Sequence, residues 1–175
     1  NIAGTDLVIE TGLLAQQAAG AVTVSYGDTT VFTAVTNTDT PREGIDFFPL
    51  QCEYREKFYA AGKFPGGFFK REARPTSKEI LTARMCDRPI RPLFPDGYYN
   101  DVQVNSTLIQ TDGTREGDFL AVNAASAALH ISEIPFMGPI GCVRIGRIDG
   151  EWIINPTHEQ KSKSDIDLLY AGLRG

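Results

Sequence analysis

The stretch from Lys63 to Arg91 concentrates the side chains best suited to bind a polyanion. It holds eight basic and three acidic residues, a net charge of +5, whereas the whole chain of 175 residues carries −5. A cationic stretch in an otherwise acidic protein is the electrostatic pattern of a nucleic-acid site. The basic residues assigned to this site are Lys70, Arg71, Arg74, Arg84, Arg88 and Arg91.

Two aromatic residues, Phe68 and Phe69, separate the turn sequence PGG at 65–67 from Lys70 and Arg71. Proline presets φ and glycine accepts positive φ, so we expect the aromatic and basic pairs at the tip of a loop. Aromatic rings stack on the bases of single-stranded nucleic acid at about 1–3 kcal/mol per base, while cations contact the phosphates. The alternative is that both rings pack in the core and the charges form a solvated face.

A helix is predicted over 77–87, directly after this loop. The sequence TSKE at its start matches a capping box, and Pro89 is expected to stop or kink the helix. Arg84 and Arg88 are four residues apart and therefore share one face. Arg91 joins that face only if the helical phase continues past Pro89.

The rest of the chain predicts an α/β (α+β) fold, with a mixed or antiparallel sheet packed against helices. Gly-Asp and Asp-Gly pairs between neighbouring strands predict two hairpins. The fourth predicted strand is expected to extend the sheet of the first hairpin, as an antiparallel scaffold for the basic loop. The predicted strands are 7–10, 21–26, 29–35, 47–54, 102–110, 142–148, 151–154 and 164–170, and an alanine-rich helix is predicted over 118–131.

Gly113-Thr114-Arg115 lies between a predicted strand and a predicted helix. A glycine turn before a helix N-terminus offers backbone N–H groups to an anion, and Thr114 and Arg115 would add a hydroxyl and a guanidinium. The sequence therefore allows a phosphate site. The simpler interpretation, favoured from the residues alone, is that Gly113 closes a turn, Asp118 caps the helix and Arg115 lies in solvent.

Metal and thiol chemistry have little support in the sequence. Asp165 and Asp167 alternate on one strand face and could hold a hard cation such as Mg²⁺, although such a pair is more often solvated. The two histidines are isolated, which argues against a histidine metal site or triad. The three cysteines are scattered, so free thiols in a reducing cytoplasm are expected.

Two further expectations concern where the protein resides and how long it is. The sequence has neither a run of 18 apolar residues nor the basic and apolar regions of a signal peptide, so we expect a cytoplasmic protein without a membrane partner. The chain starts without methionine and ends abruptly after a predicted strand, so we expect a fragment of a longer protein.

These residues together resemble a known family. The segment FFPLQCEYREKFYAAGKFPGGFFKREARPTSKEILTARMCDRPIRPLFPDGYYNDVQV closely resembles the first core domain of bacterial polynucleotide phosphorylases, and the likeness continues through SAAL, IPFMGPIG and NPT to DIDLLYAG. It covers essentially the whole chain. The resemblance implies a ribonuclease-PH-like fold, a ring-shaped homotrimer around an RNA channel, and phosphate-dependent 3′-to-5′ degradation of RNA to nucleoside diphosphates.

The resemblance also implies roles for parts of this chain. Residues 1–175 would be the first ribonuclease-PH-like core domain, truncated at its C-terminal end. The family's Phe-Phe-Arg-Arg loop grips RNA and maps onto Phe68, Phe69, Lys70 and Arg71, where Lys70 keeps the charge but loses the planar fork. Single-stranded RNA and RNA-degradosome proteins are the implied partners, and inorganic phosphate is the implied co-substrate.

Catalysis is implied to reside elsewhere in such proteins. The family's second copy of the fold holds the phosphate-binding turn, two aspartates, a lysine and the Mg²⁺. Here the second aspartate falls on Asp167, the first falls near Lys161 and the lysine position is Leu169, so no catalytic residue and no metal ligand is assigned. Gly113-Thr114-Arg115 nevertheless resembles the phosphate-binding Gly-Thr-Arg of ribonuclease PH, which assigns Thr114 and Arg115 to phosphate binding.

Three hypotheses follow from the sequence. The first is the non-catalytic, RNA-channelling first segment of a polynucleotide phosphorylase. The second is an RNA-binding ring subunit without an enzymatic partner copy, as in exosome-type rings. The third is a self-sufficient phosphorolytic enzyme that uses Thr114, Arg115 and Asp167.

Overall fold

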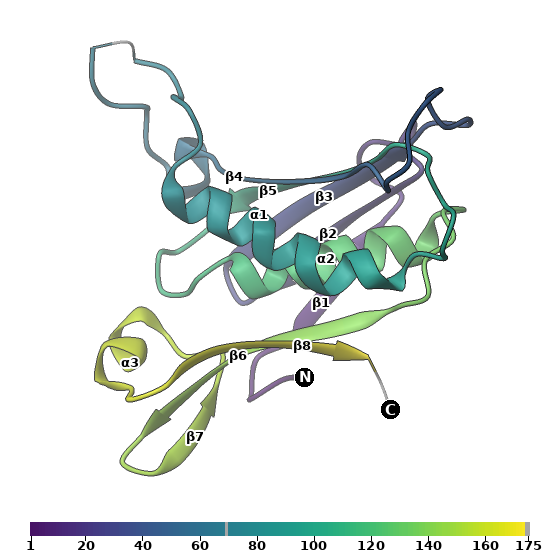
Figure 1. The fold of residues 1–175 in the computed structure, drawn as a ribbon. Helices are drawn as coiled ribbons and strands as arrows, with labels where there is room; N and C mark the ends of the chain where they lie inside the picture. The colour runs from purple at the N-terminus through teal and green to yellow at the C-terminus, as the bar shows by residue number, and fades with distance from the viewer. Residues whose placement is uncertain (69, 174–175) are drawn as a thin grey trace.

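The computed structural model describes residues 1–68 and 70–173, and within them two sheets enclose a layer of helices (Figure 1). The larger sheet has the strand order β1-β2-β3-β5-β4, and the smaller has the order β7-β6-β8. The strands are β1 (Leu7–Thr11), β2 (Gly20–Tyr26), β3 (Thr29–Asn37), β4 (Leu50–Glu56), β5 (Val102–Gln110), β6 (Ile140–Ile148), β7 (Glu151–Ile154) and β8 (Asp167–Leu173).

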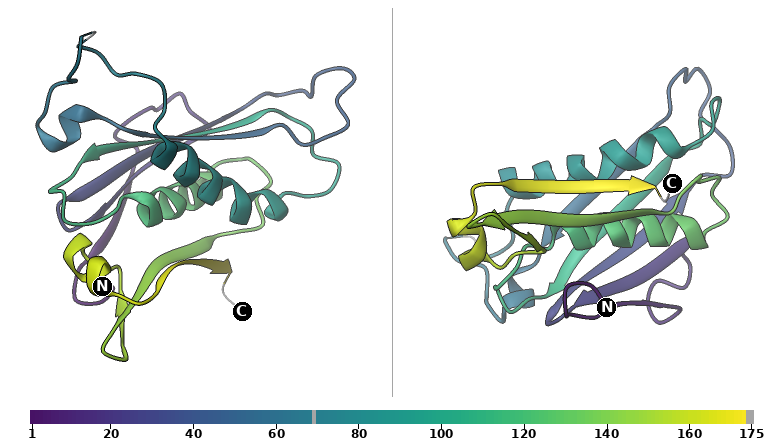
Figure 2. Two further views of the ribbon diagram at one scale, coloured as in Figure 1. Left: turned by 60° about the vertical axis from the view of Figure 1, so that its left-hand side comes forward. Right: turned by 90° about the horizontal axis from the view of Figure 1, so that it is seen from below.

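The helices lie mainly between the two sheets. Figure 2 shows the smaller sheet on the side of the long helices opposite the larger sheet. The fold class predicted from the sequence, a mixed sheet packed against helices, is confirmed. The helices are α1 (Ser77–Ile90), α2 (Asp118–Ile131) and α3 (His158–Lys163), and the 3₁₀ turns are η1 (Phe58–Ala61) and η2 (Arg91–Leu93).

The core forms where α2 packs between the sheets. β2 and β3 bury alternate side chains against it, as the two-residue period of a strand requires. A helix covered on both sides must be apolar around most of its circumference, which explains the alanine-rich sequence of α2. Gly20 permits the close approach, because a Cβ there would lie 2.2 Å from the carbonyl oxygen of Ala128.

The position of β4 corrects two expectations. The strand covers Leu50–Glu56 instead of 47–54, and it pairs with β5 in parallel instead of adding to an antiparallel scaffold. Parallel neighbours need a long crossover connection, and here the crossover contains the basic loop and α1. β4 therefore lies at the edge of the larger sheet, with α1 packed beside it.

The start of α1 is as predicted, but its end is not. Glu79 donates its backbone N–H to the Thr76 hydroxyl at 3.2 Å and accepts the Thr76 N–H at 2.6 Å, which completes the capping box. The helix continues through Pro89 to Ile90 instead of stopping near residue 87. Proline so close to the C-terminus removes one helical hydrogen bond without stopping the last turn.

Replacing Thr76 with alanine is expected to lower the free energy of unfolding by about 1 kcal/mol, because the N-cap hydroxyl is lost. Urea unfolding followed by circular dichroism measures this change. Thr76→Ser should retain the stability, and Ser77→Ala, one position into the helix, serves as the control. Equal stability of the Thr76→Ala and Ser77→Ala variants would contradict the capping role.

Two elements near the C-terminus differ from the predictions. The last strand is β8 (Asp167–Leu173) instead of 164–170, and α3 was not predicted. The signal for α3 was present, because Thr157 and Gln160 form a second capping box. No helix in the described part of the chain is long and apolar enough to cross a membrane.

Candidate nucleic-acid interface and the adjacent charge network

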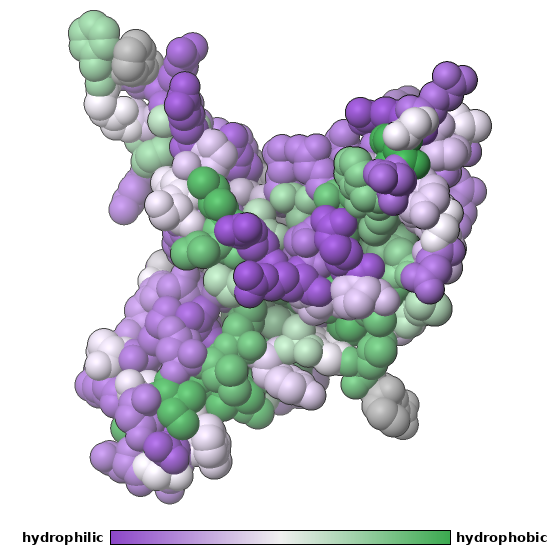
Figure 3. All heavy atoms as spheres, viewed as in Figure 1, coloured by the Kyte–Doolittle hydropathy of each residue, from purple (hydrophilic) through white to green (hydrophobic). Residues whose placement is uncertain are grey.

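The basic loop, of which the structure describes residues 62–68 and 70–76, projects from the body of the molecule between η1 and α1 (Figures 1 and 3). Gly67 has φ of +77°, in agreement with the predicted turn. Phe68 is 94 % exposed, so its ring is not part of the core. Phe69 lies outside the described residues. The loop therefore presents an aromatic ring to solvent beside Lys70 and Arg71, which are both exposed.

Apart from Arg71, the basic side chains of the loop and α1 divide into two groups. Lys78 and Arg91 are used within the fold, since each forms an ion pair with a carboxylate. A second group forms no ion pair within residues 1–68 and 70–173. That group comprises Lys63, Lys70, Arg74, Arg84 and Arg88, together with Arg55 of β4.

Arg91 lies at the C-terminal end of α1 and keeps the helical phase past Pro89. Its guanidinium forms an ion pair with Asp87 at 2.6 Å and donates to the carbonyl oxygens of Phe48 and Leu50 at 3.1 and 3.0 Å. The hydrogen bond to Asp87 is the main reason why the pKa of Arg91 is raised. Arg91 thus ties α1 to β4, and its predicted contact with RNA stays a prediction.

Arg84 and Arg88 share the exposed face of α1, as their spacing predicted. They line a groove of about 520 Å³ between α1 and β4, with Arg55 on the opposite wall. In Figure 3 hydrophilic side chains lie over the middle of α1, although Ile80 and Leu81 of the same helix are exposed apolar residues. The basic surface therefore extends from the projecting loop along α1.

The turn at Gly113 is closed by its own side chains. Thr114 donates its backbone N–H and its hydroxyl to Asp112, each at 2.9 Å, and these hydrogen bonds lower the pKa of Asp112. Arg115 lies over the ring of Tyr26 at 5.5 Å and donates to the carbonyl oxygen of Asn155. Arg115 is therefore not in solvent, and a phosphate at this turn would compete with the Asp112 carboxylate. The assignment of Thr114 and Arg115 to phosphate binding stays a prediction.

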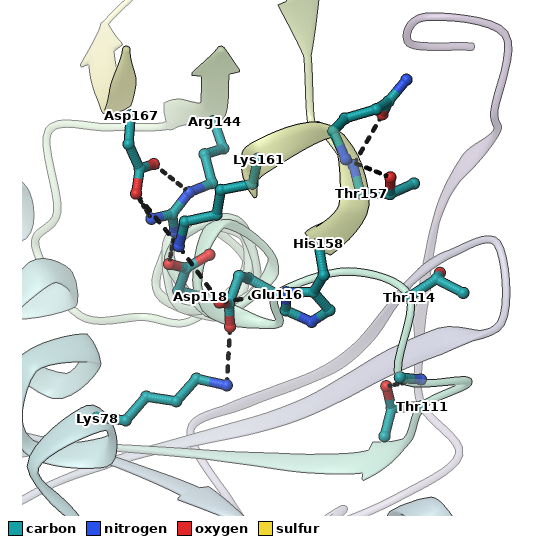
Figure 4. Close-up of polar contacts among 12 residues, drawn as sticks. Lys78, Thr111, Thr114, Glu116, Asp118, Arg144, Thr157, His158, Lys161 and Asp167 are labelled. Carbon is teal, nitrogen blue, oxygen red and sulfur yellow. Dashed lines mark hydrogen bonds and ion pairs between the residues drawn. The ribbon is translucent and has the colours of Figure 1, made fainter. Parts of the chain in front are cut away.

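A network of charges lies beside this turn, centred on the Glu116 carboxylate (Figure 4). Lys78 of α1 reaches it at 2.8 Å, Lys161 of α3 at 3.4 Å, and His158 Nδ1 lies at 3.6 Å. Burial alone would raise the pKa of Glu116, but the hydrogen bond and charge of Lys78 and the charge of Lys161 hold it below its usual value. Glu116 therefore links α1 to α3 in its ionised form.

Arg144 forms the second centre of this charge network. It pairs with Asp118 at the start of α2 and with Asp167 at 2.6 Å, and its side chain is 11 % exposed. Burial opposes its charge, but hydrogen bonds to Asp167 and the charge of Asp118 outweigh burial and raise the pKa of Arg144. The hydrogen bond from Arg144 lowers the pKa of Asp167, so both carboxylates are neutralised by one guanidinium.

The paired aspartates do not form a cation site in this arrangement. Asp165 is paired with Arg147 at 2.7 Å, and Asp167 is shared by Arg144 and Lys161, whose Nζ lies at 3.2 Å. In the described part of the chain, no group of three histidine, cysteine, aspartate or glutamate side chains is placed to hold a metal ion. A Mg²⁺ ion at Asp167 would have to displace two cationic side chains, so the residues present do not fit it.

The three cysteines are reduced thiols in the structure. Burial raises the pKa of Cys52 and of Cys142 to about 12 and raises that of Cys86 as well. Because the thiolate is the reactive form, these residues are inert at neutral pH.

The chain belongs to the RNase PH family of 3′ exoribonucleases. The family described as "3' exoribonuclease family, domain 1" matches residues 4–135, and "3' exoribonuclease family, domain 2" matches residues 138–175. The family resemblance seen in the sequence is therefore confirmed. The second match begins close to β6, so the smaller sheet corresponds to the start of the second family region.

Curated relatives share more than half of their aligned residues with this chain. The polyribonucleotide nucleotidyltransferase of Methylacidiphilum infernorum is 58 % identical over 95 % of the chain and 24 % of the relative. The protein of the same name from Thermomicrobium roseum is 58 % identical over 98 % of the chain and 22 % of the relative. The chain thus spans about a quarter of the length of these relatives.

Solved structures with the same fold have low sequence identity. Rice Rrp46 has a TM-score of 0.77 and 15 % identity, with 99 % of this chain and 77 % of that chain covered. A chain of the Archaeoglobus fulgidus exosome, solved with RNA bound to its active site, has a TM-score of 0.70 and 18 % identity, with 97 % and 77 % covered. These similarities confirm the expected ribonuclease-PH-like fold.

Proposed function

We propose that residues 1–175 form the first, non-catalytic core segment of a polyribonucleotide nucleotidyltransferase. In the full-length protein this segment binds single-stranded RNA while a second copy of the fold degrades it from 3′ to 5′ with inorganic phosphate, releasing nucleoside diphosphates. The observation that carries the proposal is the projecting loop, with its exposed Phe68 near Lys70 and Arg74, which form no ion pair in the part of the chain that the structure describes. The names and the high identity of the curated relatives support the enzymatic class.

The proposal assigns RNA binding to the loop and to one face of α1. Phe68 and Phe69 stack on bases or narrow a channel, while Lys70, Arg71 and Arg74 contact phosphates. Arg84, Arg88 and Arg91 extend this surface along the helix, although Arg91 also has the structural role described above. Thr114 and Arg115 remain candidates for a weaker phosphate contact.

The assembly and cofactors of the full-length protein belong to the same proposal. Mg²⁺ is bound by the second copy, because Arg144 and Lys161 neutralise Asp167 in this one. The protein is cytoplasmic, forms a homotrimeric ring around the RNA and associates with RNA-degradosome proteins. The alternative of an RNA-binding ring subunit without an enzymatic partner copy is less well supported, because the relatives that match almost the whole chain are named as nucleotidyltransferases.

Replacing Lys70, Arg71 and Arg74 with alanine in the full-length protein is expected to weaken RNA binding to a similar extent for all sequences. The slope of log affinity against log salt should fall by roughly 0.7 for each phosphate that the protein no longer neutralises. Fluorescence anisotropy with labelled oligo(A) and oligo(U) at several salt concentrations measures both quantities. Lys163→Ala, a charge removal on the exposed side of α3, is the control.

Replacing Phe68 and Phe69 with alanine should act differently. The salt slope should stay unchanged while affinity falls by about 1–3 kcal/mol per stacked base. If the cation variants keep both the affinity and the salt slope of the wild type, the basic loop is a solvated surface and the proposed RNA-binding role is wrong.

A further inference from the structure

A second groove lies at the base of the projecting loop. It has a volume of about 520 Å³, within the range of about 300–1,000 Å³ that ligand pockets occupy. Its walls come from the end of β4, from η1 and from the segments that lead into and out of the loop. Its lining residues include one aromatic residue, Phe58, and four basic residues, Arg55, Lys57, Lys63 and Arg74.

The charge of this groove is unbalanced in favour of the cations. Its acidic lining residues are already engaged: Glu56 pairs with Lys78, Glu72 pairs with Lys57, and Glu79 accepts backbone N–H groups at the start of α1. Arg55, Lys63 and Arg74, by contrast, form no ion pair in the part of the chain that the structure describes. The groove therefore offers an anion the positive charges of Lys63 and Arg74, and that of Arg55, which Glu79 compensates in part.

Phe58 provides an apolar surface among these charges. Its side chain is 44 % exposed in η1, although a phenylalanine ring gains by burial. The next residue, Tyr59, is 59 % exposed but does not line the groove. An exposed ring beside uncompensated cations is the arrangement with which proteins hold single-stranded nucleic acid, because the ring stacks on a base and the cations meet the phosphates.

We propose that this groove binds one nucleotide unit of a single-stranded RNA, with the base stacked on Phe58 and the flanking phosphates held by Arg55, Lys63 and Arg74. The inference rests on the proposed RNA-binding function and adds a site that the loop residues alone do not define. Arg55 lines both this groove and the groove beside Arg84 and Arg88. In this proposal the RNA strand runs from the projecting loop past Phe58 and Arg55 onto the exposed face of α1.

The first test measures oligo(A) affinity of the full-length protein by fluorescence anisotropy at several salt concentrations. Phe58→Ala should weaken binding about tenfold with an unchanged salt slope, because the variant loses stacking but keeps every cation that meets a phosphate. Arg55→Ala should instead lower the salt slope by roughly 0.7. Tyr59→Ala, which removes a neighbouring exposed ring outside the groove, should bind as the wild type does.

The second test reports stacking directly and does not depend on the stability of the Phe58→Ala variant. The chain has one tryptophan, so Trp152→Phe gives a background without indole fluorescence from residues 1–175. Added to this background, Phe58→Trp should be quenched by saturating oligo(A), whereas Tyr59→Trp should not. Correction for the change that the Trp152→Phe protein itself shows isolates the signal of the new indole.

The outcomes separate this inference from the proposed function. If Phe58→Ala binds as the wild type and Phe58→Trp is not quenched, while the loop variants weaken binding, the groove site is wrong and the RNA-binding role stands. If the loop variants also bind as the wild type, both are wrong. Quenching of Phe58→Trp together with weaker binding of Phe58→Ala supports the site.

Discussion

Replacing Arg144 with methionine is expected to lower the free energy of unfolding by about 3–5 kcal/mol, the cost of breaking a buried ion pair by removing one partner. The guanidinium is the hub between Asp118, almost fully buried at the start of α2, and Asp167 of β8. Its removal leaves the Asp118 carboxylate buried without a cationic partner. Urea unfolding of the chain at neutral pH measures the loss.

The control for this variant is Arg147→Met on the same strand. Arg147 also pairs with an aspartate, Asp165, but both side chains are solvent-exposed, so little change in the unfolding midpoint is expected. The Arg144 pair should also weaken at acid pH. Because the pKa of Asp167 is lower in the folded than in the unfolded chain, its contribution is present above the unfolded pKa and is lost as the pH falls through the folded pKa. Similar losses for both variants would show that burial of Arg144 is unimportant.

Residues 1–175 expressed alone are expected to release no nucleoside diphosphate from poly(A) in the presence of phosphate and Mg²⁺. The ammonium of Lys161 lies between Glu116 and Asp167, at 3.4 and 3.2 Å, where a divalent cation would need carboxylates free of other partners. Chromatography of the products against an ADP standard measures the release. The full-length protein, which should be active under the proposed function, is the positive control.

The contrary result is equally clear. Phosphate-dependent release of ADP by a preparation of residues 1–175, abolished by Asp167→Ala, would establish a self-sufficient phosphorolytic enzyme. Circular dichroism of both proteins checks that the difference arises from the chemistry and not from unfolding.

The elements that the sequence located correctly are those with local signals. The capping box of α1, the Asp149-Gly150 hairpin and the boundaries of α2 each depend on residues close together in the chain. The sequence placed β4 in the correct sheet but three residues too early and with antiparallel pairing, because its parallel partner β5 lies beyond α1 and no local pattern encodes that pairing. α3 was not predicted, although Thr157 and Gln160 have the spacing of a capping box.

At the candidate site, the sequence shows which residues are basic but not which of them form ion pairs within the fold. Eight basic residues between Lys63 and Arg91 look alike in a charge count, yet Lys78 and Arg91 are bound to carboxylates of the fold. Phe58 and Arg55 were missed because they lie before the basic stretch and reach its groove only through the fold. The roles of Glu116 and Arg144 depend on contacts across 23 or more residues, which spacing alone does not predict.

The hydrogen bonds that fix α1 to β4 do not involve the projecting loop. Glu79 accepts the backbone N–H of Glu56 at one end of β4, and Arg91 donates to the carbonyl oxygen of Leu50 at the other, so α1 is fixed to the strand at both ends. Doubling the length of a flexible loop costs only about 0.6 kcal/mol of closure entropy. Changes in the length of this loop should therefore alter the stability of the domain only slightly.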